Sequence, residues 1–373
     1  MKTIRLTASL IACLVMAAGC SKIDGPYYQG SNSDGGMLKK LPMSQVITIE
    51  PSGSDDTDAF VQAFDDAKEA GHGSVIQLCE GQYRLGFIEV RDFYGSLKGA
   101  GKGKTIITAM DNLDISPLLA RGLLPDLIKF VGGDVHLSHF TIRTPPGKIS
   151  VGGSGNGNIL SLLSFSANNY DYEPLNEERS INVIIDNICL QGQRLETGEG
   201  YKGYVFYYNC AYALRTSGDY YKWTGDPVPR QKVDISITNS EFDTFCYGVV
   251  LEDLKNSQLV VGEKNKGNTF NNLDRAGGVW EGRDNKIIVS GNIFNIPAYS
   301  WGFAVDDYPY YSFLKNEPPQ GPSLFDISNN VFNMEYADYG LFIRNILNYY
   351  YGHIPMAIQV KNNLFTMADG WEW

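Results

Sequence analysis

Four short segments in the second half of the sequence open with glycine, continue with apolar residues and end in charged or polar residues. They are Gly248-Val-Val-Leu-Glu252-Asp253, Gly278-Val-Trp280-Glu281-Gly-Arg283, Gly302-Phe-Ala-Val-Asp306-Asp307 and Gly340-Leu-Phe-Ile-Arg344-Asn345. If these segments are strands stacked in register, neighbours lie ~4.8 Å apart. One row then holds Glu252, Gly282, Asp306 and Arg344, and the next holds Asp253, Arg283, Asp307 and Asn345. The pattern predicts that carboxylates and arginines converge along one edge.

Carboxylates at this spacing suit cleavage of a glycosidic bond. Hydrolysis uses two carboxyl groups ~5 to 9.5 Å apart, one of which stays protonated, and crowding of like charges raises one pKa. Aromatic rings offer sugars a flat apolar face. The candidate catalytic residues are therefore Glu281, Asp306, Asp307 and Arg344, and the candidate substrate-binding residues are Glu252, Asp253, Trp280, Arg283, Trp301 and Tyr308. The alternative is that these charges only solvate the surface and form ladders between strands.

A six-residue pattern recurs along the chain and indicates what positions these segments. It reads apolar, any, Asn/Gly/His, any, any, Phe/Leu/Ile, and it starts at Leu137, Ile185, Ile237, Val289, Ile327 and Val360, with a degenerate copy at Asn265. The period predicts a solenoid with a coil of roughly 24 residues, in which the first two intervals are double turns and the last two are single turns with insertions.

The residue types of the pattern suit the corners of such a coil. Asn and Gly reach positive φ at least cost, stacked Asn side chains can hydrogen-bond from coil to coil, and the sixth residue points inward. We predict that Phe242, Phe294, Phe332 and Phe365 stack inside the coil. A β-sandwich of short strands is the rival fold.

The residues before the repeat predict a cap for the solenoid. A strand is expected at Val46–Ile49, followed by a helix with N-cap side chains in 54–57, an apolar face of Ala59, Phe60, Ala63, Phe64 and Ala67, and a stop at Gly71-His72-Gly73. The stretch from Asp55-Asp56-Thr57 through Gly81-x-Tyr83 to Leu97-x-Gly99-x-Gly101 resembles the N-terminal cap and first coil of pectate-lyase-like proteins. The resemblance implies an all-β, single-stranded right-handed parallel β-helix over residues 41–373 with an N-terminal capping helix.

The same resemblance implies polysaccharide as the ligand. Lyases of this fold family use a base, often Arg or Lys, with Ca²⁺ or Arg to neutralise the substrate carboxylate, so Ca²⁺ stays open as a cofactor. The Asn-Thr-Asp and Arg-Ile-Lys motifs of the related hydrolases have no clear counterparts, so elimination and hydrolysis both stay open. Two functions are predicted: a surface polysaccharide lyase or glycoside hydrolase, and alternatively a non-catalytic glycan-binding, adhesive or structural surface protein.

The first residues indicate the compartment. Lys2 and Arg5 precede an apolar stretch that ends in Ala17-Ala18-Gly19-Cys20, which resembles the lipobox of bacterial lipoproteins. We expect residues 1–20 to be a signal peptide with lipidation at Cys20, and residues 21–40 to be a flexible tether. Residues 21–25 resemble the export signal of Bacteroidetes surface lipoproteins. The expected location is the outer membrane, with the lipid as the only membrane attachment.

Charge and cysteine content exclude other classes. The net charge is −11, and loss of Lys2 and Arg5 brings it to about −13, so nucleic acid is not an expected partner. Cys79, Cys189, Cys210 and Cys246 are widely spaced, so zinc is not predicted and no residues are assigned as metal ligands, while free thiols or one disulfide stay open. The end of the solenoid, up to Trp373, carries no predicted cap. We expect the chain itself to leave this end unshielded, either because it is a shortened version of a longer protein or because a partner or a second copy covers it. The alternative is that the insertion around 345–355 folds over the last coil.

Overall fold

The structure is a computed structural model that describes residues 44–111, 113, 125–145, 159–168, 179–194, 210–216, 231–297, 300–307, 323–335, 339–345 and 356–368. The chain divides into two units, Met1–Lys40 and Leu41–Trp373. The predicted signal peptide, the tether, Cys20, Tyr308 and the last five residues lie outside the described residues. The helix and all the strands belong to the second unit.

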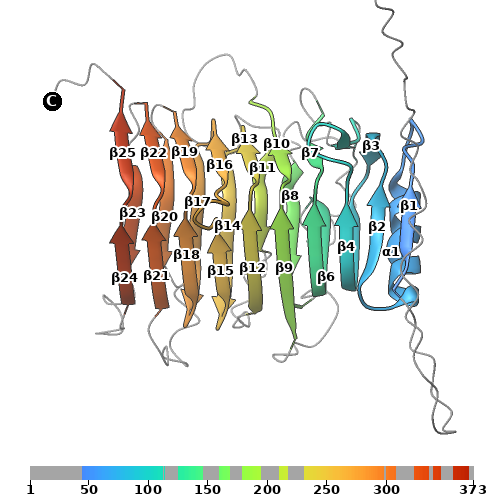
Figure 1. The fold of residues 1–373 in the computed structure, drawn as a ribbon, viewed down its shortest axis with the longest axis horizontal. Helices are drawn as coiled ribbons and strands as arrows, with labels where there is room; N and C mark the ends of the chain where they lie inside the picture. The colour runs from blue at the N-terminus through green and yellow to red at the C-terminus, as the bar shows by residue number, and fades with distance from the viewer. Residues whose placement is uncertain are drawn as a thin grey trace, which may run out of the picture. The chain divides into compact units, whose positions relative to one another are not determined.

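The described residues of the second unit form one helix and 25 strands, and the strands stack in parallel (Figure 1). A coil crosses three faces. The first face contains the first halves of β4 (Ile88–Lys98) and β6 (Asp126–Ser138), then β8 (Ile159–Ser166), β11 (Cys210–Thr216), β14 (Tyr247–Lys255), β17 (Arg275–Arg283), β20 (Trp301–Asp307) and β23 (Tyr339–Asn345).

The second face contains β1 (Val46–Ile49), β2 (Ser74–Leu78), the second halves of β4 and β6, β9 (Ser180–Asp186), β12 (Lys232–Thr238), β15 (Gln258–Val261), β18 (Lys286–Ser290), β21 (Ser323–Ser328) and β24 (Met356–Lys361). The third face contains β3 (Gly81–Leu85), β5 (Thr105–Ala109), β7 (Thr141–Arg143), β10 (Cys189–Gln191), β13 (Glu241–Asp243), β16 (Thr269–Asn271), β19 (Ile293–Ile296), β22 (Val331–Met334) and β25 (Leu364–Met367). This is the predicted right-handed parallel β-helix.

The recurring pattern marks the corner between the second and third faces. Its third residue has positive φ in six copies: His139 (63°), Asn187 (56°), Asn239 (52°), Gly291 (72°), Asn329 (58°) and Asn362 (54°). Its fourth residue forms a buried ladder. Asn292 Nδ2 donates to Val261 O (2.7 Å) and to Asn330 Oδ1 (3.0 Å), while the Asn268 backbone N–H donates to Asn292 Oδ1 (2.9 Å). Both expectations for the corner are confirmed.

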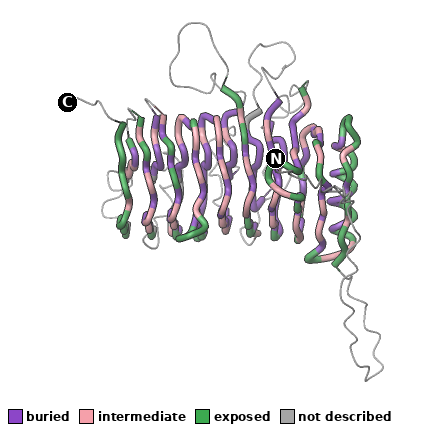
Figure 2. Tube along the Cα trace, turned by 45° about the horizontal axis from the view of Figure 1, so that its top comes forward, coloured by how far each residue is buried: buried purple, intermediate pink, exposed green. Residues whose placement is uncertain are grey.

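The sixth residues stack as predicted. The rings of Phe242, Phe270, Phe294, Phe332 and Phe365 follow one another at 4.7 to 4.8 Å, nearly parallel. The first four are at most 1% exposed, but Phe365 is 45% exposed, so the prediction of burial is wrong at that position. Its outer side is not covered by a further described coil, and the last described coil is exposed in Figure 2.

The prediction of double turns is wrong. β7 pairs directly with β10 and β10 with β13, so the intervals of 48 and 52 residues between pattern copies each span one coil. The remaining length is inserted between strands of that coil. A sequence period cannot separate a skipped coil from an insertion, because a longer surface loop costs little additional closure entropy.

Helix α1 (Thr57–Ala70) covers the N-terminal end of the stack (Figure 1). Phe60, Ala63, Phe64 and Ala67 are buried, and the ring of Phe64 packs edge-on against Phe93 (5.1 Å) and Phe130 (5.8 Å). One detail of the prediction is wrong, because Ala59 is exposed. Among the residues expected to cap the helix, Asp55 Oδ1 accepts the backbone N–H of Thr57 (2.9 Å), whereas the buried carboxylate of Asp56 accepts the backbone N–H groups of Ser52 (2.8 Å) and Arg84 (3.0 Å).

Candidate functional site

Two rows of residues run from coil to coil along the first face, and several of their members are buried. Row one contains Asp126, Ser161, Tyr212, Tyr247, Arg275, Trp301 and Tyr339. Row two contains Glu89, Lys129, Ser164, Arg215, Val250, Gly278, Ala304 and Phe342. Between the two rows the strands send core residues such as Leu163, Leu214 and Phe303 inward. Neighbours within a row are one strand spacing apart, ~4.8 Å.

Row one is a ladder of aromatic rings with an arginine inserted into it. The rings of Tyr212 and Tyr247 stack at 5.0 Å. Arg275 follows, with Cζ 5.3 Å from the Tyr247 ring centre and 4.0 Å from that of Trp301, and its Nη1 donates to Tyr247 Oη at 3.1 Å. Trp301 then meets Tyr339 edge-on at 5.5 Å. Tyr339 is 46% exposed and the other three ring residues are half-buried. The guanidinium group is thus held in one orientation between two aromatic rings.

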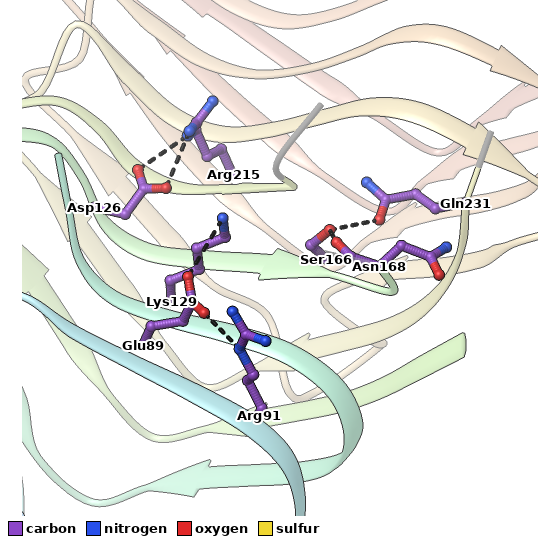
Figure 3. Close-up of polar contacts among 8 residues, drawn as sticks. All are labelled: Glu89, Arg91, Asp126, Lys129, Ser166, Asn168, Arg215 and Gln231. Carbon is purple, nitrogen blue, oxygen red and sulfur yellow. Dashed lines mark hydrogen bonds and ion pairs between the residues drawn. The ribbon is translucent and has the colours of Figure 1, made fainter. Parts of the chain in front are cut away.

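The N-terminal end of the site holds a buried ion pair (Figure 3). Arg215 donates Nε and Nη2 to the two oxygens of Asp126 at 3.2 and 3.0 Å, and both side chains are at most 3% exposed. Ser161 donates its hydroxyl to the same carboxylate. Each charge is paired by two hydrogen bonds, so the carboxylate of Asp126 and the guanidinium group of Arg215 are held in a fixed geometry although both are buried.

Further charged side chains lie beside this pair on β4 and β6. Glu89 accepts from Arg91 Nε at 2.7 Å and lies 3.8 Å from Lys129 Nζ (Figure 3). Ser164 lies between Lys129 and Arg215 in row two, and its buried hydroxyl has no hydrogen-bond partner among the described residues. Two cations and a hydroxyl thus lie within three neighbouring strands of one row.

A half-buried carboxyl group lies beside row one, at the corner before β17. Burial raises the pKa of Asp274, while the positive charges of Arg275 and Arg194 and a hydrogen bond from Ser300 act in the opposite direction. A carboxyl group with a raised pKa is suited to act as a general acid.

Four of the ten predicted site residues form a third row, two positions along the strands from row two. The backbone register places Glu252, Trp280, Asp306 and Arg344 side by side, and it pairs Asp307 with Asn345. Continuing the register by one residue places Glu281 between Asp253 and Asp307. The side chains of these residues lie outside the described part of the structure, whereas Trp301 is described and belongs to row one.

The predicted alignment of β17 is wrong by two residues. Val250 pairs with Gly278, so Trp280 and not Gly282 is level with Glu252, and Arg283 is level with Lys255. The position equivalent to Gly248 is Ala276, whereas Gly277 makes room for a ring: a Cβ there would lie 2.7 Å from Phe303. Matching strands by their glycines therefore selected the wrong residue.

Sequence reasoning missed most of the polar site. Asp126 and Arg215 are 89 residues apart, and no motif marks either of them. Three aromatic members of row one directly precede glycines at which strands were expected to start. Their spacing could have been found by extending each predicted strand backward by one residue, which aligns Tyr247, Trp301 and Tyr339.

Thiol chemistry and metal binding find little support in the described residues. Cys189, Cys210 and Cys246 are free, whereas Cys79 is disulfide-bonded. Burial raises the pKa of Cys189 and of Cys246 to about 12, so neither thiol ionises near neutral pH. Within the described ranges, no three His, Cys, Asp or Glu side chains gather as a metal site, and no helix is long and apolar enough to span a membrane.

No protein-family profile and no curated protein matches the chain. Among solved structures, it is similar to the PL6 family alginate lyase AlyGC, with 12% identity and a TM-score of 0.41 over 91% of this chain and 41% of the lyase. The exopolygalacturonase of Thermotoga maritima gives 9% identity and a TM-score of 0.37 over 87% and 88% of the two chains. PfbA, a surface adhesin of Streptococcus pneumoniae, gives 14% and 0.35 over 86% and 90%. At this identity the similarity concerns the fold.

Proposed function

We propose that this chain is a cell-envelope lipoprotein that binds an acidic polysaccharide along the outer surface of the first face. The observation that carries the proposal is the position of Arg275 between Tyr247 and Trp301. A guanidinium group fixed in this way keeps its planar set of donors ready for a carboxylate or sulfate group. The neighbouring rings offer apolar surface to the C–H groups of a sugar.

Within rows one and two, Arg275 carries the attraction for an anionic ligand. The chain carries a net charge of −11, and in these rows Lys129 lies 3.8 Å from Glu89 while Arg215 is paired with Asp126. The guanidinium group of Arg275, held between two rings, attracts anionic groups to that position. Because the rungs of the solenoid repeat at ~4.8 Å, a polymer lying along the rows contacts several coils at once.

Cleavage of the bound chain is the second candidate function, and Asp274 is the observation that favours it. Burial raises its pKa, which favours the protonated form needed for proton donation to a leaving oxygen, while the charge of Arg275 acts in the opposite direction. Glu281, Asp306, Asp307 and Arg344, the catalytic residues predicted from the sequence, lie near the other end of the same strands, roughly 20 Å from Asp274 along the strand direction. They therefore remain a proposed catalytic group of their own, separate from Asp274. A chain that binds without cleaving would serve as an adhesive or structural surface protein.

Attachment to the outer membrane through Cys20 completes the proposal. It is supported by the sequence Ala17-Ala18-Gly19-Cys20, whose resemblance to a lipobox places a lipid at the N-terminus. The lipid would hold the β-helix at the cell envelope, where polysaccharides are accessible.

The test is the affinity of the full chain for soluble alginate and polygalacturonate. Arg275→Ala removes a charge-assisted hydrogen bond worth about 1.5 to 3 kcal/mol, so binding should weaken about 10- to 100-fold. Arg275→Lys keeps the charge but loses the planar set of donors, so its affinity should lie between those of wild type and Arg275→Ala. Asp306→Asn and Arg344→Ala should also weaken binding with little change in melting temperature.

Lys264→Ala is the matched control, because it removes one positive charge from an exposed turn. Equal affinity of Arg275→Ala and Lys264→Ala for both acidic polymers would refute the proposed site. Assays for new reducing ends and for unsaturated products on the same polymers separate hydrolysis, elimination and binding without cleavage.

A further inference from the structure

A second row of polar side chains runs along the outer surface of the third face. Asn271, Asn295, Asn333 and Thr366 are neighbours in the register of β16, β19, β22 and β25. Asn295 Nδ2 donates to Asn271 Oδ1 at 2.7 Å, Asn333 Nδ2 donates to Asn295 Oδ1 at 2.8 Å, and Thr366 Oγ1 donates to Asn333 Oδ1 at 2.7 Å. Asn295, Asn333 and Thr366 are exposed. We call this row the outer amide ladder.

The outer ladder differs from the buried ladder in how many hydrogen bonds it completes. An Asn amide has two N–H donors and two acceptor lone pairs. In the buried ladder, Asn292 uses both donors, on Val261 O and Asn330 Oδ1. In the outer ladder, Asn295 and Asn333 each use one donor and one acceptor within the row. Each of these two rungs therefore keeps one donor and one acceptor for a ligand or water.

A groove of about 360 Å³ lies beside this ladder. Its lining combines the amides with apolar groups and contains Asn272, Asn295, Ile296, Pro297, Asn333, Met334, Glu335, Thr366, Met367 and Ala368. One carboxylate and no cation are present in this lining, in contrast to the rows of the first face. The groove thus disfavours an anionic ligand and offers apolar contact next to paired donors and acceptors.

We infer that the outer amide ladder and its groove bind a neutral polysaccharide. An amide with one free donor beside one free acceptor matches two adjacent sugar hydroxyls, which can accept and donate at once. The apolar groups of the groove match the C–H face of a pyranose ring. Nucleic acid and acidic glycans are disfavoured by Glu335 and by the lack of a cation. This site is independent of the acidic-polysaccharide site proposed on the first face.

An extended peptide is the other ligand with regularly repeated donors and acceptors. The peptide groups on one side of a strand repeat every second residue, at ~6.6 to 6.8 Å, whereas the rungs of the ladder repeat at ~4.8 Å. A peptide lying along the row would therefore lose register after one rung. A glycan chain contacts the amides through hydroxyl groups that rotate, so it tolerates the spacing.

The experiment measures retardation of the full chain in gels containing hydroxyethylcellulose or soluble mannan. Ala368→Trp places a large side chain in the groove and leaves the ladder intact, so affinity for the neutral polymer should fall at least tenfold. Lys264→Trp adds the same side chain to an exposed turn and should leave the affinity unchanged. Asn333→Leu, which removes a rung, should weaken binding as well, and its melting temperature shows whether the coil stays folded.

Arg275→Ala separates the two sites, because it should weaken binding of alginate and leave binding of the neutral polymers unchanged. The inference is overturned if the wild-type chain is retarded by neither neutral polymer, or if Ala368→Trp is retarded as strongly as wild type. It is also overturned if an extended peptide binds in the groove and is lost in Ala368→Trp, since the occupant is then a protein segment.

Discussion

Replacing Phe294 with Ala tests the stack that fills the solenoid. The Phe294 side chain is fully buried, and Phe→Ala substitutions at buried sites cost ~3 to 5 kcal/mol through lost burial and the cavity left behind. Phe294 also stacks at 4.7 Å on both Phe270 and Phe332, and such aromatic pairs add ~0.5 to 1.5 kcal/mol each beyond burial. We therefore expect a loss near the upper end of that range, about 4 to 5 kcal/mol.

Phe365 supplies a matched substitution within the same stack. It is 45% exposed and stacks on Phe332 at 4.8 Å, so about half of its burial and one aromatic pair are lost in Phe365→Ala. The expected loss is about 2 kcal/mol. The two variants should thus differ by about 2 to 3 kcal/mol although the substitution is the same.

Urea unfolding followed by tryptophan fluorescence and by circular dichroism measures both losses. In a solenoid each coil contacts mainly its neighbours, so Phe365→Ala should also loosen the last coil locally, seen as faster amide hydrogen exchange in β24 and β25. Equal losses for the two variants, with coincident transitions, would show that position in the stack does not matter. A loss below ~2 kcal/mol for Phe294→Ala would refute the packing argument itself.

Two further predictions concern charge and anchoring. Because burial raises the pKa of Asp274, its contribution to stability is present below the unfolded pKa of ~3.9 and is lost as pH rises through the folded value. Asp274→Asn should therefore melt above wild type at pH 7, and the difference should shrink toward pH 4; a difference independent of pH would contradict the assignment. Cys20→Ala should move the protein from the membrane to the soluble fraction, and palmitate labelling that persists in this variant would exclude Cys20 as the anchor.

The corners and the core could be predicted from the sequence because their constraints are local. Positive φ at Asn239 and Asn329 selects Asn or Gly whatever the neighbouring coils contain. The inward position of Phe242 or Phe294 recurs three residues after each such corner. A single copy of the pattern describes only a turn, but its repetition identifies the coil.

The polar site could not be predicted in the same way because its contacts depend on which coils are adjacent. Asp126 meets Arg215 across 89 residues, and the length of each insertion hides how many coils separate two strands. The outer amide ladder has the same difficulty, since Asn295 and Asn333 are 38 residues apart and meet only after the register is known. Residues on one strand can be predicted together, whereas residues on neighbouring strands need the register.

The alignment of β17 that was predicted from the sequence differs from the observed one by two residues. Side chains alternate with a period of two along a strand, so a shift by one residue exchanges the two sides of a sheet, whereas a shift by two restores the side and changes only the neighbours. The structure moves β17 by two, from Gly248 opposite Gly278 to Val250 opposite Gly278. The shift therefore changes which residues are paired along the strands: Trp280 joins Asp306, and Arg283 moves beside Lys255. Variants on this face should therefore be grouped by the observed rows. Arg283 is in the row of Lys255, whereas Asp306 and Arg344 share another row.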